Sequence, residues 1–392
     1  MLLFAFKREA RIVIPDVGRI LEACASLGCL YLFLSLAVVL FWRSAPERNR
    51  RDGGEAVTIM KPLHGSEPRL VECLSSFCTQ DYNGPTQLVF GIQDRNDAGA
   101  LAAAKEIKAK FPALPVTITI DESVHGTNAK ISNLINMEPA AANDILLVAD
   151  SDILAPPNHV EQVVALLQKP GAGAVSFLYH GEGAAGFWSR LSAQCINAHF
   201  LPNVLVGMKL GLAKPCFGST VALRRETLNA IGGFEAFANH LADDYAIGEA
   251  VRATGQSVEI SSFSVAHICS EESARELMDH QLRWARTIRT IDLPGYLGSF
   301  IANPFIIACL GIAARNHYCL GIAALALFLR LALCKAVEQS FRLKTQDYWM
   351  VPITDLISFS VYVWSFFGSA VTWKRAHYDV LSDGTLAHSR EG

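Results

Sequence analysis

The chain has 392 residues, of which 51% are hydrophobic and only 18% are charged, so part of it is expected to lie in lipid rather than in water. Its formal net charge is -3, and it has no block of basic residues interleaved with aromatics, which argues against nucleic acid as a partner. The 10 cysteines are scattered without a CxxC pair, and we expect reduced thiols that pack as small apolar residues.

The first long apolar segment runs from Ile20 to Trp42 and is interrupted only by Glu22. Its length matches the roughly 20 residues that a helix needs to cross a bilayer. We therefore expect residues 1–52 to form an N-terminal membrane anchor, with its span at about 20–42. Basic residues on both sides weaken the charge argument, but those after the span favour a cytoplasmic location for the next segment: Arg43, Arg48, Arg50 and Arg51.

Residues 53–270 alternate short β-rich runs with helical stretches, the pattern of a sheet that is covered by helices. The predicted strands are Val57–Met60, Gln87–Ile92, Val116–Ile120, Ile145–Ala149 and Ala174–Leu178. Pro68–Thr79 and Gly99–Lys110 are predicted to be intervening helices. This region is expected to be an α/β domain, in which ligands bind at the carboxyl ends of the strands.

Acidic side chains stand at three positions where such ligands would bind. Asp94 follows one predicted strand, Asp150 and Asp152 follow another, and Asp243 and Asp244 open a helical segment. An Asp-x-Asp pair after a buried strand places two carboxylates within reach of one divalent cation, which also binds substrate phosphates. A turn or a helix cap is the alternative for these residues, because Asp favours both positions. Adjacent carboxylates can also have separated pKa values, which would suit one of them to general-base catalysis.

Residues 271–293 predict an amphipathic helix at the membrane boundary. Its approximate apolar stripe consists of Leu277, Trp284, Ile288 and Ile291. Arginines recur at every third position along it: Arg283, Arg286 and Arg289. A basic helix that only faces anionic lipid head groups is the alternative interpretation of this motif.

Residues 294–373 are expected to form a C-terminal membrane region, followed by a cytoplasmic tail at 374–392. Apolar stretches of near-spanning length lie at 296–314, 318–334 and 351–373. A cytoplasmic tail requires an even number of C-terminal crossings, so one stretch is expected to be re-entrant. The Asn303-Pro304 pair makes the first stretch the candidate, because a proline frees backbone groups that protein or water must satisfy.

Two charged residues, Arg330 and Asp355, lie inside these apolar stretches. An unpaired charge within a membrane costs at least about 2.5 kcal/mol, so we expect these residues to pair or to face a cavity. The alternative for Arg330 is that its long side chain reaches the membrane interface.

A larger set of motifs appears in a characteristic order along the chain. In this order they are Lys61-Pro62, Gln93-Asp94, Asn128-Ala129-Lys130, Asp150-Ser151-Asp152, Gly218-Ser219-Thr220, Asp243-Asp244-Tyr245 and His280-Gln281-Leu282-Arg283-Trp284. Together they resemble the ceramide glucosyltransferase family, the family 21 glycosyltransferases, over about residues 57–378. The chain is most similar to the bacterial branch associated with hopanoid biosynthesis, in His64-Gly65, His125-Gly126-Thr127-Asn128 and the segments 216–220 and 241–248.

The resemblance implies a GT-A nucleotide-sugar-binding domain, a Rossmann-like mixed sheet, with transmembrane helices at both ends of the chain. It implies that Asp94 contacts uridine, that Asp150 and Asp152 bind the metal-diphosphate, and that Asp244 deprotonates the acceptor. The other implied substrate-binding residues are Lys61, Pro62, Asn128, Lys130, Asp243, His280, Gln281, Arg283 and Trp284. The sequence departs from the family pattern at His280, where Gln or Arg usually begins the closing motif, and at Asp152, where the second acid is often missing.

The implied reaction is an inverting transfer from a UDP-sugar to a hydroxyl of a membrane lipid, assisted by Mg²⁺ or Mn²⁺. The sugar would be N-acetylglucosamine or glucose, and the acceptor a hopanoid (bacteriohopanetetrol) or ceramide. The implied location is the bacterial inner membrane, with the catalytic domain facing the cytoplasm. Two alternatives are a processive polysaccharide synthase, which usually needs more spans, and a non-catalytic lipid-binding scaffold, against which the complete set of acids argues.

Overall fold

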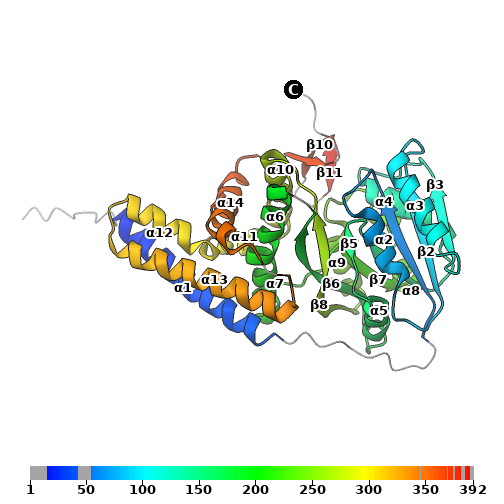
Figure 1. Ribbon diagram of the computed structural model, residues 1–392, viewed down its shortest axis with the longest axis horizontal. Helices are drawn as coiled ribbons and strands as arrows, with labels where there is room; N and C mark the ends of the chain where they lie inside the picture. The colour runs from blue at the N-terminus through cyan, green and yellow to red at the C-terminus, as the bar shows by residue number, and fades with distance from the viewer. Residues whose placement is uncertain are drawn as a thin grey trace, which may run out of the picture.

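The computed structural model describes residues 16–42, 54–184, 186–344, 346–368, 370–373, 376–380 and 385–388. These residues form a sheet domain and a group of apolar helices that projects from it (Figure 1). The arginines expected to orient the first span, Arg43, Arg48, Arg50 and Arg51, lie outside the described residues, as do most of the positions of the expected tail.

Within the described residues, eight strands form one mixed sheet in the order β3-β2-β1-β4-β7-β6-β8-β5. They are β1 (Val57–Leu63), β2 (Thr86–Ile92), β3 (Val116–Ile120), β4 (Ile145–Ala149), β5 (Ile153–Leu154), β6 (Ala172–Gly183), β7 (Thr220–Arg224) and β8 (Ser257–Cys269). Strands β1 to β4 pair in parallel, whereas β7 lies antiparallel between β4 and β6. Each predicted strand is present, so the expectation of a mixed α/β sheet is confirmed.

Helices cover both faces of the sheet, because successive residues of a strand point to opposite sides. In β1, for example, Ile59 packs on one face with α2, α3 and α5, whereas Met60 packs on the other with α4, α8 and α9. The helices are α2 (Leu70–Cys78), α3 (Ala98–Lys110), α4 (Ala129–Met137), α5 (His159–Leu167), α8 (Arg225–Ala230) and α9 (Asp243–Ala253). A 3-10 turn, η1 (Glu138–Ala140), follows α4, and another, η3 (Phe234–Phe237), lies between α8 and α9.

A long helical segment separates the sheet from the apolar helices (Figure 1). It consists of α6 (Gly186–Cys195), a π-helical turn η2 (Ile196–Phe200) and α7 (Leu201–Lys209). Leu201 and Leu205 of α7 belong to one apolar cluster with Leu32 of α1 and Leu333 of α13. This segment therefore joins the sheet domain to the helices that were predicted to enter the membrane.

Among the described residues, two helices are long and apolar enough to cross a membrane, α1 (Val17–Leu40) and α13 (Tyr318–Phe341). A third candidate is interrupted: the stretch Leu293–Ala302, made of α11 (Leu293–Gly298) and the 3-10 turn η4 (Ser299–Ala302), meets α12 (Pro304–Ala313) at an angle of 64°. The break falls at Asn303, where the sequence predicted a re-entrant stretch. Helices α1, α12 and α13 pack side by side (Figure 1).

The last predicted stretch, 351–373, is not one continuous helix. Helix α14 (Val351–Trp364) follows the 3-10 turn η5 (Tyr348–Met350) and has 14 residues. At 1.5 Å per residue it spans about 21 Å, less than the roughly 30 Å of a bilayer core. The chain turns at Gly368, which has a φ of +104°, and continues into a small sheet: β9 (Ala370–Trp373), β10 (Ala376–Val380) and β11 (Leu386–His388). The near-spanning stretch expected at 351–373 is therefore α-helical only over Val351–Trp364.

The buried charges of this region are paired, as the sequence predicted. Arg330 and Asp355 are 0% and 1% exposed, and Arg330 Nε lies 3.1 Å from Asp355 Oδ1. His199 Nε2 lies 3.0 Å from the same oxygen. Arg330 also donates hydrogen bonds to the backbone carbonyls of Ala198 and Ala302. The pair thereby connects α13, α14, the π-helical turn η2 and the break before α12.

Candidate active site

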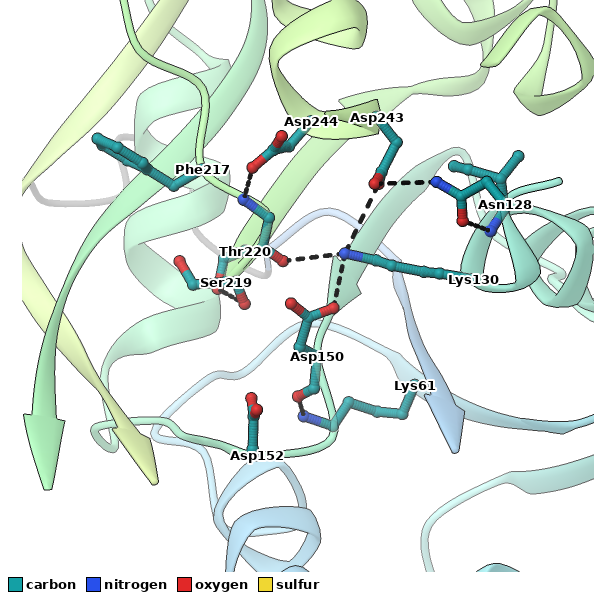
Figure 2. Close-up of polar contacts among 12 residues, drawn as sticks. Lys61, Asn128, Lys130, Asp150, Asp152, Phe217, Ser219, Thr220, Asp243 and Asp244 are labelled. Atoms are coloured by element: carbon teal, nitrogen blue, oxygen red, sulfur yellow. Dashed lines mark hydrogen bonds and ion pairs between the residues drawn. The ribbon is translucent and has the colours of Figure 1, made fainter. Parts of the chain in front are cut away.

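The carboxylates that follow β4 meet those that open α9 around one lysine (Figure 2). Lys130, in the first turn of α4, places its Nζ 2.6 Å from Asp150 Oδ1 and 3.7 Å from Asp243 Oδ2. Burial alone would lower the pKa of Lys130, but Asp150 and Asp243 hold that pKa above its ordinary value. The sequence-predicted residues Lys130, Asp150, Asp152, Asp243 and Asp244 are therefore brought together, and we call the four aspartates the acidic cluster.

Asp152 faces a residue that sequence reasoning did not find. His267 of β8 lies opposite Ile153 of β5 in the strand register, and its Nδ1 is 3.4 Å from Asp152 Oδ1. Burial would raise the pKa of Asp152, but His267 and Lys61 hold it below its ordinary value. Among the described residues this buried Oδ1 makes the ion pair but no hydrogen bond. This oxygen is thus enclosed, with the His267 ring as its neighbour.

Two backbone hydrogen bonds fix the carboxylate of Asp244 at the start of α9. Its Oδ2 accepts a hydrogen bond from the backbone N–H of Gly218 at 2.5 Å, and its Oδ1 accepts one from the N–H of Tyr245 at 2.8 Å. Burial and the neighbouring Asp243 raise the pKa of Asp244 to about 6. A Cβ at Gly218 would stand 3.1 Å from Asp244 Oδ2 and 3.2 Å from Lys130 Nζ, so the close approach depends on glycine.

Lys61 lies behind the acidic cluster rather than at the substrate surface. Its side chain is 0% exposed, and its Nζ donates to the backbone carbonyl of Asp150 and sits 3.9 Å from the centre of the Phe77 ring. Burial lowers the pKa of Lys61 to about 8. Because the ammonium is enclosed, the expectation that Lys61 contacts substrate is corrected: it supports the turn that presents Asp150. Its neighbour Pro62 is half-buried in β1.

Asn128 is likewise a supporting residue. It is 0% exposed and caps α4, because its Oδ1 accepts a hydrogen bond from the N–H of Ile131 at 3.0 Å. Its Nδ2 donates to the carbonyl of His240 at 2.8 Å and to Asp243 Oδ1 at 3.2 Å. The expectation that Asn128 binds substrate directly is therefore corrected: with no exposed surface, it acts through Asp243.

The predicted closing motif lies on α10 (Ala274–Ile291). His280 Nδ1 is 2.6 Å from Glu271 Oε1, and the same oxygen accepts a hydrogen bond from the Ser192 hydroxyl at 2.8 Å. The ring of Trp284 is 4.4 Å from that of His280, centroid to centroid. Gln281 Nε2 is buried and has no hydrogen-bond partner among the described residues. His280 is thus tied to the protein, whereas Gln281 retains a free donor.

Arg283 brings a positive charge toward the acidic cluster. Burial lowers the pKa of Arg283, while Tyr179, Asp150 and Asp152 act on it in the opposite direction.

Asp94 differs from the other predicted acids, since it is exposed beyond β2 and accepts a hydrogen bond from the N–H of Asn96 at 2.8 Å. Within the described residues no hydrogen bond or ion pair joins Asp94 to the acidic cluster, so its contact with uridine stays a prediction.

Two further ionisable side chains at the site escaped the sequence analysis. Glu67 follows β1, and burial together with Asp152 raises its pKa to about 7. The rule that polar residues after a strand line a ligand site could have found it. Tyr179 lies within β6, and burial together with Asp244 raises its pKa well above the ordinary value. No comparable sequence signal marks Tyr179, because a tyrosine in a strand is unremarkable.

Asp150 and Asp152 are the residues that would hold a divalent cation. Carboxylate oxygens are the ligands that hard divalent ions prefer, and Asp152 Oδ1 makes no hydrogen bond within the described residues. His267 is the ion-pair partner of Asp152; burial alone would lower the pKa of His267, but Asp152 raises it and so favours the protonated ring, which does not bind metals. No group of three His, Cys, Asp or Glu side chains among the described residues is arranged to hold an ion by itself. Substrate phosphates would have to complete the coordination, as they do at many Mg²⁺ sites.

Comparison with known proteins gives relatives across most of the chain. Ceramide glucosyltransferases 1 and 3 of Caenorhabditis elegans are 22% and 24% identical to it over 271 residues, which cover 68% and 69% of this chain and 57% and 58% of theirs. The chain therefore spans less than two thirds of the length of these relatives. Among solved structures, a mannosyltransferase from Pyrobaculum calidifontis in complex with GDP-Man and Mn²⁺ has a TM-score of 0.50 at 18% identity, over 90% of this chain and 98% of that chain.

The likeness to the solved structure concerns the fold, and it confirms the predicted GT-A architecture. The family itself is identified by sequence. A match to the family described as glycosyl transferase family 21 extends over residues 20–386, which include the acidic cluster, α10 and the apolar helices. This chain belongs to glycosyl transferase family 21.

Proposed function

We propose that this chain transfers a hexose, N-acetylglucosamine or glucose, from a UDP-sugar to a hydroxyl of a membrane lipid. The acceptor is a hopanoid such as bacteriohopanetetrol, or ceramide, and the reaction inverts the configuration of the sugar. Family membership supports glycosyl transfer, and two C. elegans relatives are named as ceramide glucosyltransferases. The apolar helices α1 and α13 support a lipid acceptor, because they would hold the site beside a bilayer.

The observation that carries the proposal is the placement of Asp244. Its carboxylate is buried, hydrogen-bonded to two backbone N–H groups, and has a pKa raised to about 6. Such a group is ionised at neutral pH yet basic enough to accept a proton in the transition state. We assign Asp244 as the general base that removes the proton of the acceptor hydroxyl.

The displacement then needs no covalent intermediate. The acceptor oxygen bonds to the anomeric carbon as the bond from that carbon to the UDP oxygen breaks, and the bonding electrons leave with UDP. Asp150 and Asp152 would hold a Mg²⁺ or Mn²⁺ ion, which would neutralise charge on the diphosphate when bound. Arg283 adds a positive charge from α10, and Lys130 fixes Asp150.

The membrane location belongs to the same proposal. We place α1 and α13 across the bacterial inner membrane with the sheet domain on the cytoplasmic side, where UDP-sugars are made. The bent α11–η4–α12 segment would cross as well, because Asn316 at its end donates to the carbonyl of Gly18 at the start of α1, whereas Ser340 at the end of α13 donates to that of Val39 near the end of α1. Two crossings return α14 to the side of the sheet domain, where it contacts α6 and α10. Labelling of single-cysteine variants in intact cells tests this arrangement: a cysteine at Asp144 is expected to be protected from an impermeant reagent until the cells are opened.

The direct test is a transfer assay with the purified chain in lipid nanodiscs. UDP-N-acetylglucosamine and UDP-glucose are each supplied with bacteriohopanetetrol or ceramide, and products are identified by mass spectrometry while released UDP is measured. We expect one lipid to receive a single hexose. A polymeric product would favour a polysaccharide synthase, and binding of UDP-sugar without UDP release would favour a non-catalytic scaffold.

Two controls assign the chemistry within that assay. Asp244→Asn should abolish transfer and leave UDP-sugar binding largely intact, whereas Asp144→Asn, at the opposite end of β4 and 59% exposed, should change neither. Chelation by EDTA should stop transfer, and Mn²⁺ or Mg²⁺ should restore it. Full turnover by the Asp244→Asn variant would refute the assignment of Asp244 as the base. Full turnover in excess chelator would refute the requirement for a metal ion.

A further inference from the structure

Four aromatic side chains from four different segments meet beside the acidic cluster. Tyr179 comes from β6, Phe200 from the π-helical turn η2, Phe217 from the segment before β7, and Trp284 from α10. The Tyr179 ring lies 4.8 Å from Phe200, 5.8 Å from Phe217 and 6.1 Å from Trp284, centroid to centroid. Tyr179, Phe200 and Trp284 are only partly buried. We call all four residues, Phe217 included, the aromatic cluster.

The aromatic cluster is adjacent to the proposed base. Phe217 immediately precedes Gly218, whose N–H holds Asp244 Oδ2 at 2.5 Å (Figure 2). The backbone of Phe217 is itself fixed, because its N–H donates to the Ser176 hydroxyl at 2.7 Å. The carboxylate of Asp244 also contributes to the raised pKa of Tyr179. The rings therefore stand next to the carboxylate that a reacting hydroxyl would approach.

The same rings continue the apolar core of the membrane helices. Phe217 belongs to a buried cluster that includes Leu32 and Val39 of α1 and Leu333 of α13, and Tyr179 and Phe200 pack against it. Apolar packing thus extends from the helices long enough to span a membrane to the residue before Gly218. The partly exposed rings of Tyr179 and Phe200 are the part of this packing that a lipid acceptor could contact.

A clamp between Asn197 and Gly181 sets the geometry of the rings. The buried Asn197 side chain accepts from the Gly181 N–H at 2.8 Å and donates to the Gly181 carbonyl at 3.0 Å. A Cβ at Gly181 would lie 2.5 Å from the Cα of Ala193, so β6 and α6 touch through glycine. The clamp fixes Tyr179 relative to Phe200, and π-helical turns like η2 are frequent at functional sites.

We propose that Tyr179, Phe200 and Phe217 form the acceptor subsite, which holds the apolar part of an uncharged lipid next to its reacting hydroxyl. This inference rests on the proposed function and adds the residues that select its acceptor. The charges of the site favour an uncharged acceptor, because Asp243 and Asp244 would repel a phosphate at the reacting end. Aromatic faces suit the apolar body of such a lipid and contribute no charge.

Kinetics of conservative variants provide the first test. Phe200→Leu and Phe217→Leu keep an apolar side chain but remove the ring, so each should raise the KM for a short-chain ceramide or for bacteriohopanetetrol about three- to tenfold. The KM for the UDP-sugar should stay unchanged. Phe111→Leu is the matched control, since it removes a half-buried ring at the end of α3 on another face of the sheet. Unchanged acceptor KM in both variants would overturn the proposal.

Photo-crosslinking provides a second test that needs no turnover and is thus independent of the proposed function. A ceramide probe with a diazirine in its chain is bound to the wild-type chain in nanodiscs with UDP, irradiated, and mapped by peptide mass spectrometry. Labels within 176–183, 196–204 or 214–218 are expected, with labelling reduced in Phe217→Leu. Labels confined to α12 or α14 would overturn the acceptor subsite, whereas specific labels without any transferred sugar would leave it standing and refute only the proposed reaction.

Discussion

Lys130 Nζ lies 2.6 Å from Asp150 Oδ1 and thereby joins the first turn of α4 to the carboxyl end of β4. The same Nζ reaches Asp243 Oδ2 at 3.7 Å and donates to the carbonyl of Gly218 at 3.3 Å. One cation thus connects the proposed metal ligand, the neighbour of the proposed base and the backbone that holds this base.

Replacing Lys130 with Met should weaken both the fold and the donor site. The carboxylates of Asp150 and Asp243 would lose their shared cation, and breaking a buried pair is costly. Because the Asp150 side chain is 36% exposed, water offsets part of this cost, and we expect a loss of about 2 kcal/mol. Thermal unfolding and the KM for UDP-sugar measure the two effects. Lys169→Met, at the surface pair with Glu259, should cost less than about 0.5 kcal/mol, and equal losses in the two variants would contradict the prediction.

The pH dependence of transfer should report Asp244. A carboxylate acts as a base only when ionised, so kcat/KM should rise with pH through the pKa of Asp244, about 6. Part of this elevation comes from Asp243. Asp243→Asn should therefore shift the acid limb of the pH profile to lower pH, even if it also lowers the maximum rate. If the acid limb of the kcat/KM profile stays in place in Asp243→Asn, the group that titrates is not Asp244.

Lys61→Met should lower both stability and transfer. Removing one partner leaves the carbonyl of Asp150 without its donor, which typically costs about 1–3 kcal/mol. Transfer should fall because this carbonyl belongs to the turn that presents Asp150. The pKa of Lys61 drops from 10.5 to about 8 on folding, so wild-type stability should rise between these pH values as the ammonium loses its proton. Thermal unfolding against pH should show this rise in the wild type and not in the variant.

Asp355→Leu should destabilise the apolar helices strongly. Arg330 would remain buried without its carboxylate, which typically costs about 3–5 kcal/mol. The double variant Arg330→Met/Asp355→Leu should recover most of that loss, because neither charge is then left unpaired. Thermal unfolding in detergent measures the cycle, with Lys335→Met on the exposed side of α13 as the control. If the loss of stability in the double variant equals the sum of the losses in the two single variants, Arg330 and Asp355 are not coupled.

The parts of the molecule that were predictable have strong local signals. The run Ile145–Ala149 is buried at every position, and its hydrophobicity alone marked β4 and therefore Asp150 after it. Helix α1 was likewise visible as a long apolar run, and the break at Asn303 was visible as a proline within another apolar run.

The missed residues depend on contacts between distant segments. Strand β8 contains several serines and is only partly buried along its first half, so no hydrophobic alternation marked it, and His267 was overlooked with it. Lys61 and Asn128 belong to recognisable motifs, but their burial behind the acidic cluster follows from the packing of Phe77 and His240 around them. The π-helical turn η2 has no sequence signature, because its extra residue is stabilised by Asn197 and β6.

The clamp between Asn197 and Gly181 also limits which parts of the molecule can move. Since it locks η2 to β6, the sheet and the segment from α6 to α7 should behave as one rigid body. Helix α10 is attached to this body as well, because Glu271 binds both His280 of α10 and the Ser192 hydroxyl of α6, and Trp284 contacts the rings of Tyr179 and Phe200. We therefore expect this wall of the site to keep its shape when a substrate binds.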